Sequence, residues 1–356
     1  MREVADAPIL ITGGAGFIGS NLADRLAGEG HRIRILDALS RDGTERNLAW
    51  LQANHAGRIE FIHADIRDEA RLAAAASDVK AVFHLAAQVA VTTSMVDPRA
   101  DFAINIAGTL NILEALRTRG DCTPLIFAST NKVYGDLADL DFALEEQAYV
   151  PTDAQTRAHG IGEARPLDFH TPYGCSKGAA DQYVLDYARS FGVPTAVLRM
   201  SCIYGRRQMG TEDQGWVAHF LIRALEGKPI TLYGDGHQVR DILDVSNAVD
   251  AYVRAWQRID TVSGRAFNLG GGPANAVSLR QLLAYIGDLT GRDVDVSYSD
   301  WREGDQRYFV ADTRAAQAAL GLAPRVDWRV GVANLARWLA GERRLNLPIE
   351  QESVAA

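Results

Sequence analysis

Cysteine, basic charge and long apolar runs are all scarce in this chain of 356 residues. Its three cysteines, Cys122, Cys175 and Cys202, show no Cys-X-X-Cys spacing, which favours reduced thiols over a disulfide framework. The chain carries 45 Asp and Glu against 37 Lys and Arg, and no basic run, so DNA and RNA are poor candidate partners. No apolar run approaches the roughly 20 residues that span a bilayer, which excludes a membrane-spanning helix.

The N-terminal segment lacks the pattern of a secretory signal. Met1–Ala7 contains Glu3 and Asp6, whereas a signal peptide has a basic region followed by an apolar core. We therefore expect a cytoplasmic protein with no membrane partner. A hydrophobic fraction of 47% and a charged fraction of 23% are those of a globular chain, which excludes a disordered one.

Short β-branched runs alternate with amphipathic stretches through the first 200 residues. This alternation predicts an α/β fold, a doubly wound parallel sheet with helices on both faces. The predicted strands are Pro8–Thr12, Ile33–Leu36, Ile59–His63, Val79–Leu85, Leu125–Ser129 and Thr195–Arg199. Helices are predicted after Gly16, before His55, after Arg67, around Asn105–Arg119 and around Ser176–Phe191.

Beyond residue 200 the alternation weakens, and a loop-rich stretch, Tyr204–Gly215, comes first. Helices are predicted at Trp216–Glu226, Val245–Trp256 and Leu279–Leu289, the last two with Ser246 and Ser278 as N-caps. We expect residues 1–200 to form a dinucleotide-binding domain, to which 235–262 return. Residues 201–350 should form mainly a smaller, substrate-binding domain.

A glycine-rich segment, Thr12–Gly19, directly follows the first predicted strand. Its glycines at 13, 16 and 19 permit a tight turn, let the backbone approach a pyrophosphate and let the next helix pack closely. The phosphates would face the positive end of that helix. Asp37 ends the second strand, where an acid holds the adenosine ribose hydroxyls and repels a 2′-phosphate. The pattern predicts a Rossmann-type domain that binds NAD.

Tyr173 and Lys177 are four residues apart at the start of a helix and so share a face. A free tyrosine has a pKa near 10 and is a poor base at neutral pH. A nearby ammonium and a positive nicotinamide ring would lower the pKa of Tyr173, so that it could take a proton from a sugar hydroxyl. Thr130 ends the fifth strand, at the sheet edge where ligands bind, and could donate to the reacting oxygen.

Together these motifs resemble the extended short-chain dehydrogenase/reductases that act on nucleotide-sugars, over nearly the whole chain. The resemblance implies that Thr130, Tyr173 and Lys177 are catalytic. It implies NAD contacts from Gly13, Gly16, Phe17, Ile18, Gly19, Asp37, Asp65, Ile66, Leu85, Ala86, Ala87, Asn105, Tyr173 and Lys177. It implies substrate contacts from Asn131, Cys202, Gln214, Arg240 and Arg302, with no metal. The two arginines would clamp a diphosphate, whose oxygens a guanidinium fork fits.

Within that family, residues 129–135, 166–183 and 211–216 resemble members that invert C2 of a CDP-linked dideoxyhexose. Dehydratases of the family carry an Asp-Glu pair after the Ser/Thr, but here Asn131 and Lys132 occupy those positions, which disfavours elimination of water. Cys202 stands where the family often has a substrate-binding asparagine. The resemblance also implies a homo-oligomer, a dimer or a tetramer.

The sequence therefore predicts an NAD-dependent nucleotide-sugar epimerase that oxidises a carbinol carbon transiently; that this carbon is C2 of a CDP-sugar is implied by the resemblance. One alternative is a 4-epimerase of a UDP-sugar that uses the same three residues. A second is a non-catalytic NAD-sensing protein, since fold alone does not fix function.

Overall fold

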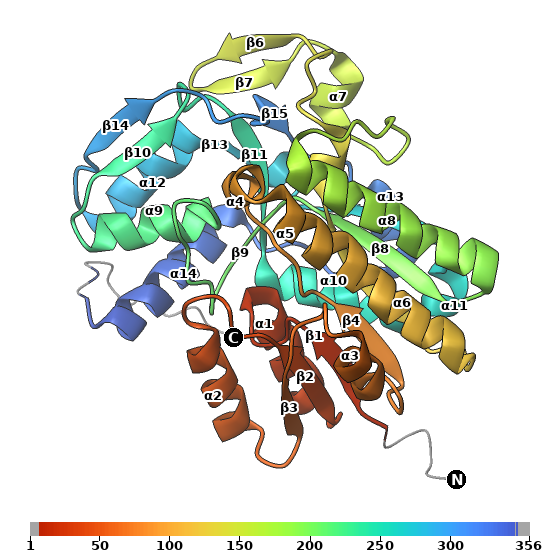
Figure 1. Cartoon of the computed structure of the whole chain (residues 1–356). Helices are drawn as coiled ribbons and strands as arrows, with labels where there is room; N and C mark the ends of the chain where they lie inside the picture. Colours follow the sequence, from red (N-terminus) through yellow and green to blue (C-terminus); the bar gives the residue numbers. More distant parts are fainter. Residues whose placement is uncertain (1–6, 346, 348–356) are drawn as a thin grey trace.

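The computed structural model describes residues 7–345 and 347, and its centre is a seven-stranded parallel sheet (Figure 1). The strand order is β12-β8-β5-β4-β1-β2-β3. The strands are β1 (Ile9–Thr12), β2 (Ile33–Asp37), β3 (Ile59–His63), β4 (Ala81–His84), β5 (Leu125–Thr130), β8 (Thr195–Met200) and β12 (Arg265–Leu269). The predicted Rossmann-type fold class is confirmed.

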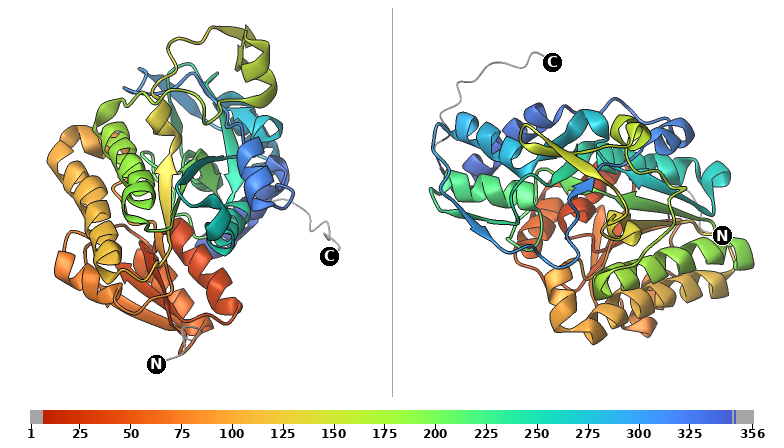
Figure 2. Two further views of the ribbon diagram at one scale, coloured as in Figure 1. Left: turned by 90° about the vertical axis from the view of Figure 1, so that its right-hand side faces the viewer. Right: turned by 90° about the horizontal axis from the view of Figure 1, so that it is seen from above.

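Both faces of this sheet are buried, because successive strand residues enter opposite hydrophobic layers. Ile9 and Ile11 of β1 pack in one layer, whereas Leu10 packs in the other. The first layer is covered by α1 (Phe17–Gly28), α2 (Thr44–Asn54) and α10 (Val245–Gln257). The second is covered by α3 (Glu69–Ala75), α6 (Gly108–Arg119) and α8 (Thr171–Phe191). Figure 2 shows α6 and α8 side by side along that face.

Smaller elements link these helices to the strands. They are α4 (Val91–Val96), α5 (Pro98–Phe102), a π-helical turn (Ala103–Ala107), a 3₁₀ turn (Asn131–Tyr134), α11 (Ile259–Val262) and α13 (Arg314–Leu320). A hairpin of β6 (Phe142–Glu145) and β7 (Ala148–Pro151), followed by α7 (Ala154–His159), lies at the top in Figure 1.

A second hydrophobic cluster unites most of the elements after residue 200. Its elements and their neighbours are β9 (Cys202–Tyr204), α9 (Trp216–Leu225), β10 (Ile230–Tyr233), β11 (Val239–Asp244), a 3₁₀ turn (Pro273–Asn275), β13 (Ala276–Ser278), α12 (Leu279–Thr290), β14 (Val296–Ser299), β15 (Tyr308–Phe309) and α14 (Trp328–Arg343). β11 pairs with β9, β13 and β15. The division into two domains stays a prediction, and its end at 348–350 lies outside the described residues.

The predicted strands before residue 200 match the observed ones to within two residues at either end, whereas β12 was not predicted. The N-cap at Ser278 is confirmed, with a full capping box to Gln281. The N-cap at Ser246 is wrong, because the Asp244 side chain accepts from the Ser246 backbone N–H. Helix α8 begins five residues before the predicted Ser176, and no described helix is long and apolar enough to cross a membrane.

Glycine at position 19 is a steric requirement of this fold. A Cβ there would collide with the backbone carbonyl oxygen of Gly13, whereas a Cβ on Gly28 of the same helix would meet nothing within 4 Å. We predict that Gly19→Ala lowers the free energy of unfolding by about 1–3 kcal/mol through overpacking.

The matched control is Gly28→Ala, which should leave that free energy unchanged or raise it by up to about 1 kcal/mol. Chemical denaturation of both variants measures the difference. Equal stability of the two would contradict the close approach of α1 to the glycine turn.

Candidate active site

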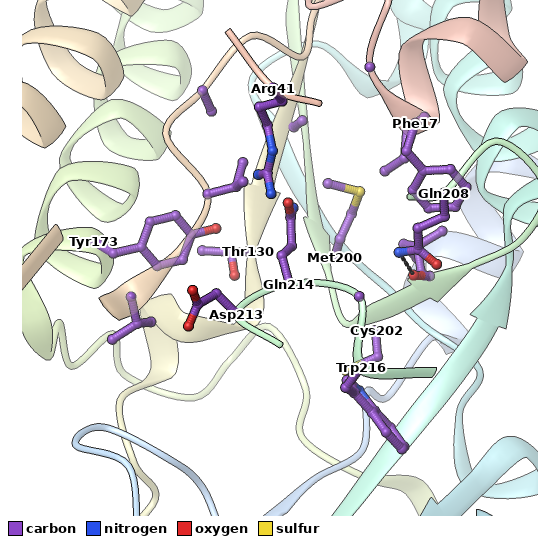
Figure 3. A pocket seen from close by; sticks show the side chains of 18 of the residues that line it. Phe17, Arg41, Thr130, Tyr173, Met200, Cys202, Gln208, Asp213, Gln214 and Trp216 are labelled. Atoms are coloured by element: carbon purple, nitrogen blue, oxygen red, sulfur yellow. Dashed lines mark hydrogen bonds between the residues drawn. The ribbon is translucent and has the colours of Figure 1, made fainter. Parts of the chain in front are cut away.

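A cavity of about 680 Å³ opens at the carboxyl edge of the large sheet. Its walls come from the turns after β1, β2, β4, β5 and β8, from α8, and from loops of the second hydrophobic cluster (Figure 3). Every predicted site residue except Asn105 lines this cavity. The structure thus brings together side chains that are up to 289 positions apart in the sequence (Gly13 to Arg302).

The glycine turn is shaped by backbone contacts that leave no room for side chains. Gly13 has a left-handed φ of +70°, and a Cβ on it would lie 2.7 Å from the backbone nitrogen of Ala86. Gly16 is the N-cap of α1. Because glycine has no side chain, the cap residue makes no side-chain hydrogen bond to the first N–H groups of the helix. A free helix N-terminus beside a close-packed turn fits an anionic pyrophosphate.

Asp37 lies beside this turn at the end of β2. Its carboxylate accepts from the backbone N–H of Ala15 at 3.0 Å and of Leu39 at 2.8 Å. Burial raises the pKa of Asp37, and these two N–H groups oppose the shift. Further along the same wall, Asp65 accepts two hydrogen bonds from the Arg67 guanidinium, at 2.9 and 2.7 Å, which lower the pKa of Asp65.

Asn105 lies behind the cavity wall instead of on it. Its side chain is 2% exposed, donates to Asp101 at 3.1 Å and to Ser176 at 3.0 Å, and accepts from the Gln88 backbone N–H at 2.9 Å. These bonds connect Asn105 to the turn after β4 and to α8, and it is not among the residues that line the cavity. The expected contact of Asn105 with the cofactor stays a prediction.

The Tyr173 hydroxyl points toward Thr130 in the cavity, the phenol coming from α8 and the threonine from the end of β5 (Figure 3). Burial raises the pKa of Tyr173 to about 12; the Asp101 charge adds to this shift and the Thr130 hydroxyl opposes it. Lys177 is not among the protein groups that shift the pKa of Tyr173, and the predicted lowering, which also requires a nicotinamide ring, stays a prediction. Lys177 donates to the Ala128 carbonyl at 2.6 Å, and burial lowers its own pKa to about 7.

A buried ion pair anchors this part of α8 to the sheet. Arg199 of β8 donates twice to Asp181 of α8, each time at 2.9 Å, and both residues are at most 5% exposed. Ser129 of β5 donates to Asp181 at 2.7 Å, and Arg199 donates to Tyr134 Oη at 3.1 Å. The pair lies one helical turn beyond Lys177 and so fixes the tyrosine and the lysine relative to Thr130.

The two predicted clamp arginines are each held by a carboxylate of the protein. Arg240 of β11 donates to Asp305 at 2.6 Å. Arg302 donates to the Glu212 carbonyl at 3.1 Å and to its carboxylate at 3.4 Å. The sequence analysis did not identify Glu212 or Asp305 as their partners.

The remaining predicted substrate contacts also line the cavity. Asn131 donates to Gln306 at 3.2 Å and accepts from Thr130 at 3.3 Å. Cys202 accepts from the Trp216 indole at 3.3 Å, and burial raises the pKa of its thiol. The Gln214 side chain extends into the cavity (Figure 3).

Asn47 and Arg41 are among the lining residues for which the sequence carries no signal. Asn47 lies on α2 and is only 2% exposed. The spacing of apolar residues in this helix does not indicate that a polar residue is buried there. Arg41 follows Asp37 by four residues in the turn after β2; burial lowers the pKa of Arg41, and the charge of Asp213 opposes that shift.

With this geometry in hand, the family of the chain is clear. Residues 9–270 match the model of the NAD dependent epimerase/dehydratase family, and the chain belongs to that family. Among curated relatives, CDP-paratose 2-epimerase of Salmonella typhi is 43% identical over 93% of this chain and 98% of its own length.

Solved structures agree with this assignment. UDP-glucose 4-epimerase of Thermotoga maritima, solved with UDP-glucose, superposes with a TM-score of 0.81 at 30% identity, over 94% of this chain and 99% of its own. UDP-glucose 4-epimerase of Thermus thermophilus, solved with NAD, superposes with a TM-score of 0.78 at 30% identity, over 94% and 99%.

The low pKa of Lys177 makes the stability of the protein depend on pH. The folded chain releases this proton near pH 7, whereas the unfolded chain keeps it to about pH 10.5. Between these values the unfolded state binds more protons, so the free energy of unfolding rises with pH. We predict that Lys177→Met removes about 2–4 kcal/mol of the rise between pH 7 and 10.

Urea unfolding at pH 7, 8.5 and 10 measures this slope. Lys228→Met, at a lysine that is 54% exposed, is the control and should keep the slope of the unaltered chain. A Lys177→Met variant with an unchanged slope would contradict a buried, proton-releasing lysine.

Proposed function

We propose that this protein is an NAD-dependent epimerase that inverts C2 of a CDP-linked dideoxyhexose, the reaction that the name CDP-paratose 2-epimerase describes. The observation that carries the proposal is the meeting of Tyr173, Thr130 and the glycine turn in one cavity. The choice of sugar and carbon is supported by the 43% identity to the Salmonella typhi protein.

The chain offers each part that a reversible oxidation at one carbon requires. Bound NAD supplies the hydride acceptor, a positive charge beside the phenol and, in the return step, the hydride. Tyr173 takes the hydroxyl proton as the C2–H bond breaks and the 2-keto sugar forms, and it gives the proton back after the sugar has turned. Thr130 holds the reacting oxygen, and its interaction with Tyr173 favours the phenolate.

The cofactor residues fit NAD on observations of this structure. Gly13 and Gly19 have no space for a Cβ, the N-terminus of α1 is uncapped by a side chain, and Asp37 presents a carboxylate at the cavity wall. That carboxylate would bind ribose hydroxyls and repel a 2′-phosphate, which favours NAD over NADP.

Elimination of water is disfavoured by the two residues that follow Thr130. The Asn131 amide is hydrogen-bonded to Gln306, and the Lys132 ammonium donates to the Gly304 carbonyl at 2.8 Å. Neither position supplies a carboxyl group that could protonate a leaving hydroxyl.

Arg240 and Arg302 are the proposed clamp for the substrate diphosphate. Both line the cavity, and the doubly charged diphosphate would compete with Asp305 and Glu212 for them. Asn131, Cys202 and Gln214 are the proposed contacts to the rest of the substrate.

A UDP-sugar 4-epimerase is the second candidate, favoured by the superposition on the Thermotoga maritima enzyme. The lower identity of that protein, 30% against 43%, places it behind the CDP-sugar proposal. A non-catalytic NAD sensor has no need of Thr130, Tyr173 and Lys177 in one cavity, which makes it the weakest of the three.

A homo-oligomer is also proposed. Phe102 of α5 and Tyr183 and Phe191 of α8 are 46–56% exposed, and α5 lies against α8, so a second copy would cover apolar surface there. The cytoplasmic location stays a prediction.

Replacement of Tyr173 by phenylalanine tests the proton transfer. Tyr173→Phe keeps the ring and removes the hydroxyl, so we expect kcat to fall at least about 100-fold while bound NAD is unchanged. Tyr298→Phe, at an exposed tyrosine of β14 that does not line the cavity, should retain full activity. Turnover by Tyr173→Phe at the rate of the unaltered chain would contradict the assigned role.

A substrate panel tests the choice of sugar and carbon. Incubation with CDP-paratose and, separately, with UDP-glucose, followed by NMR assignment of the inverted carbon, should give inversion at C2 of the CDP-sugar. Inversion at C4 of UDP-glucose alone would favour the second candidate, and no turnover with bound NAD would favour the third.

A further inference from the structure

Residues 205–215, here called the strap, cross the cavity between two distant parts of the molecule. The strap leaves β9, lines the cavity with Arg207, Gln208 and Met209, and leads into α9. Near its first residues the strap contacts α1 and α2, the helices that cover one face of the seven-stranded sheet. Near its last residues, Arg302 donates to Glu212 of the strap. The strap therefore forms part of the cavity wall and is attached on both sides of it.

Three contacts fasten the first half of the strap to α1 and α2. The Asn21 amide donates to the Arg206 carbonyl at 3.0 Å. The Arg207 guanidinium lies 3.6 Å from the centre of the Trp50 ring, a cation–π contact. Met209 packs on Gly43, where an added Cβ would lie 2.6 Å from its Cγ.

The backbone of Arg207, in the first half of the strap, is strained. Arg207 has a φ of +71°, a left-handed conformation that costs a non-glycine residue of order 1 kcal/mol or more. The stacking of Arg207 on Trp50 offsets this cost only while the strap lies against α2.

Asn47 connects the strap to the glycine turn. Its Nδ2 donates to the Ala15 carbonyl at 3.2 Å and to the Arg207 carbonyl at 3.3 Å. Because both neighbours are acceptors, the NH₂ group must face them, which fixes the orientation of the amide. Its Oδ1 is consequently left as a buried acceptor that has no partner.

Asn47 is among the residues that line the cavity, and an acceptor left unpaired costs about 1–3 kcal/mol, a cost that a donor on a bound ligand would remove. Ala15 accepts from Asn47 through its carbonyl and donates to Asp37 through its N–H, so the amide and the carboxylate lie on either side of one residue. Asp37 is the residue expected at the adenosine ribose. The donors of a dinucleotide at that end are hydroxyl and amine groups, whereas its pyrophosphate has none.

We propose that Asn47 is a further cofactor-binding residue, whose Oδ1 accepts from the adenosine end of NAD, and that through Arg207 it makes the strap a retaining clamp for the cofactor. This inference rests on the proposed NAD-dependent function. A redox-neutral cycle regenerates the oxidised cofactor at each turnover, so retention carries no penalty for the reaction.

The test measures release of NAD from the holoprotein, by the rate at which isotopically labelled NAD exchanges into it. Asn47→Ala removes the acceptor and the link to the strap, and we expect NAD to dissociate at least tenfold faster. Trp50→Ala removes the nearer of the two aromatic rings beside Arg207, the other being Trp338 at 5.7 Å. Trp50 itself does not line the cavity, so faster release from this variant reports on the strap.

Asn54→Ala is the matched control, since Asn54 lies exposed at the end of the same helix. Arg207→Ala replaces Trp50→Ala should that variant fail to fold. Release from Asn47→Ala at the rate of Asn54→Ala overturns the assignment of Asn47, and unchanged release from the Trp50 or Arg207 variant overturns the clamp. An unaltered chain that binds no NAD contradicts the proposed function itself.

Discussion

The buried ion pair between Asp181 and Arg199 is the interaction on which the site depends most. It joins α8 to β8, and through Ser129 and Tyr134 to the end of β5. Removing one member of such a pair leaves an uncompensated buried charge, which costs about 3–5 kcal/mol. Since Tyr173 and Lys177 lie on the same helix, this pair sets their distance from Thr130 and from the cavity where chemistry would occur.

Different interactions shape the cofactor side and the substrate side of the cavity. The cofactor side is made by close backbone approach, at Gly13 and Gly19, and by an uncapped helix end, so its shape is already formed. The substrate side is made by charge pairs, Arg240 with Asp305 and Arg302 with Glu212. Binding of an anionic substrate would exchange one anion for another there, which favours a ligand with two charges over one with a single charge.

Local spacing explains what could be predicted from the sequence. The glycine turn, the strands before residue 200 and the shared face of Tyr173 and Lys177 each depend on a few neighbouring residues. The partner of Arg302 is 90 positions away and that of Asn47 is 160 positions away, so no spacing rule finds them. The rise in the Tyr173 pKa that the protein groups alone produce could not be predicted, because it comes from burial and from Asp101, and Lys177 donates to Ala128, all of which only the packed structure determines.

The central claim is that one hydrogen leaves C2 of the sugar as hydride and returns to the opposite face of the same carbon. Epimerisation of CDP-paratose labelled with deuterium at C2, in ordinary water, tests it directly by NMR and mass spectrometry. The account predicts a product inverted at C2 that keeps its deuterium. Replacement of the deuterium by hydrogen from water would mean that the carbon loses a proton instead, and would contradict the account.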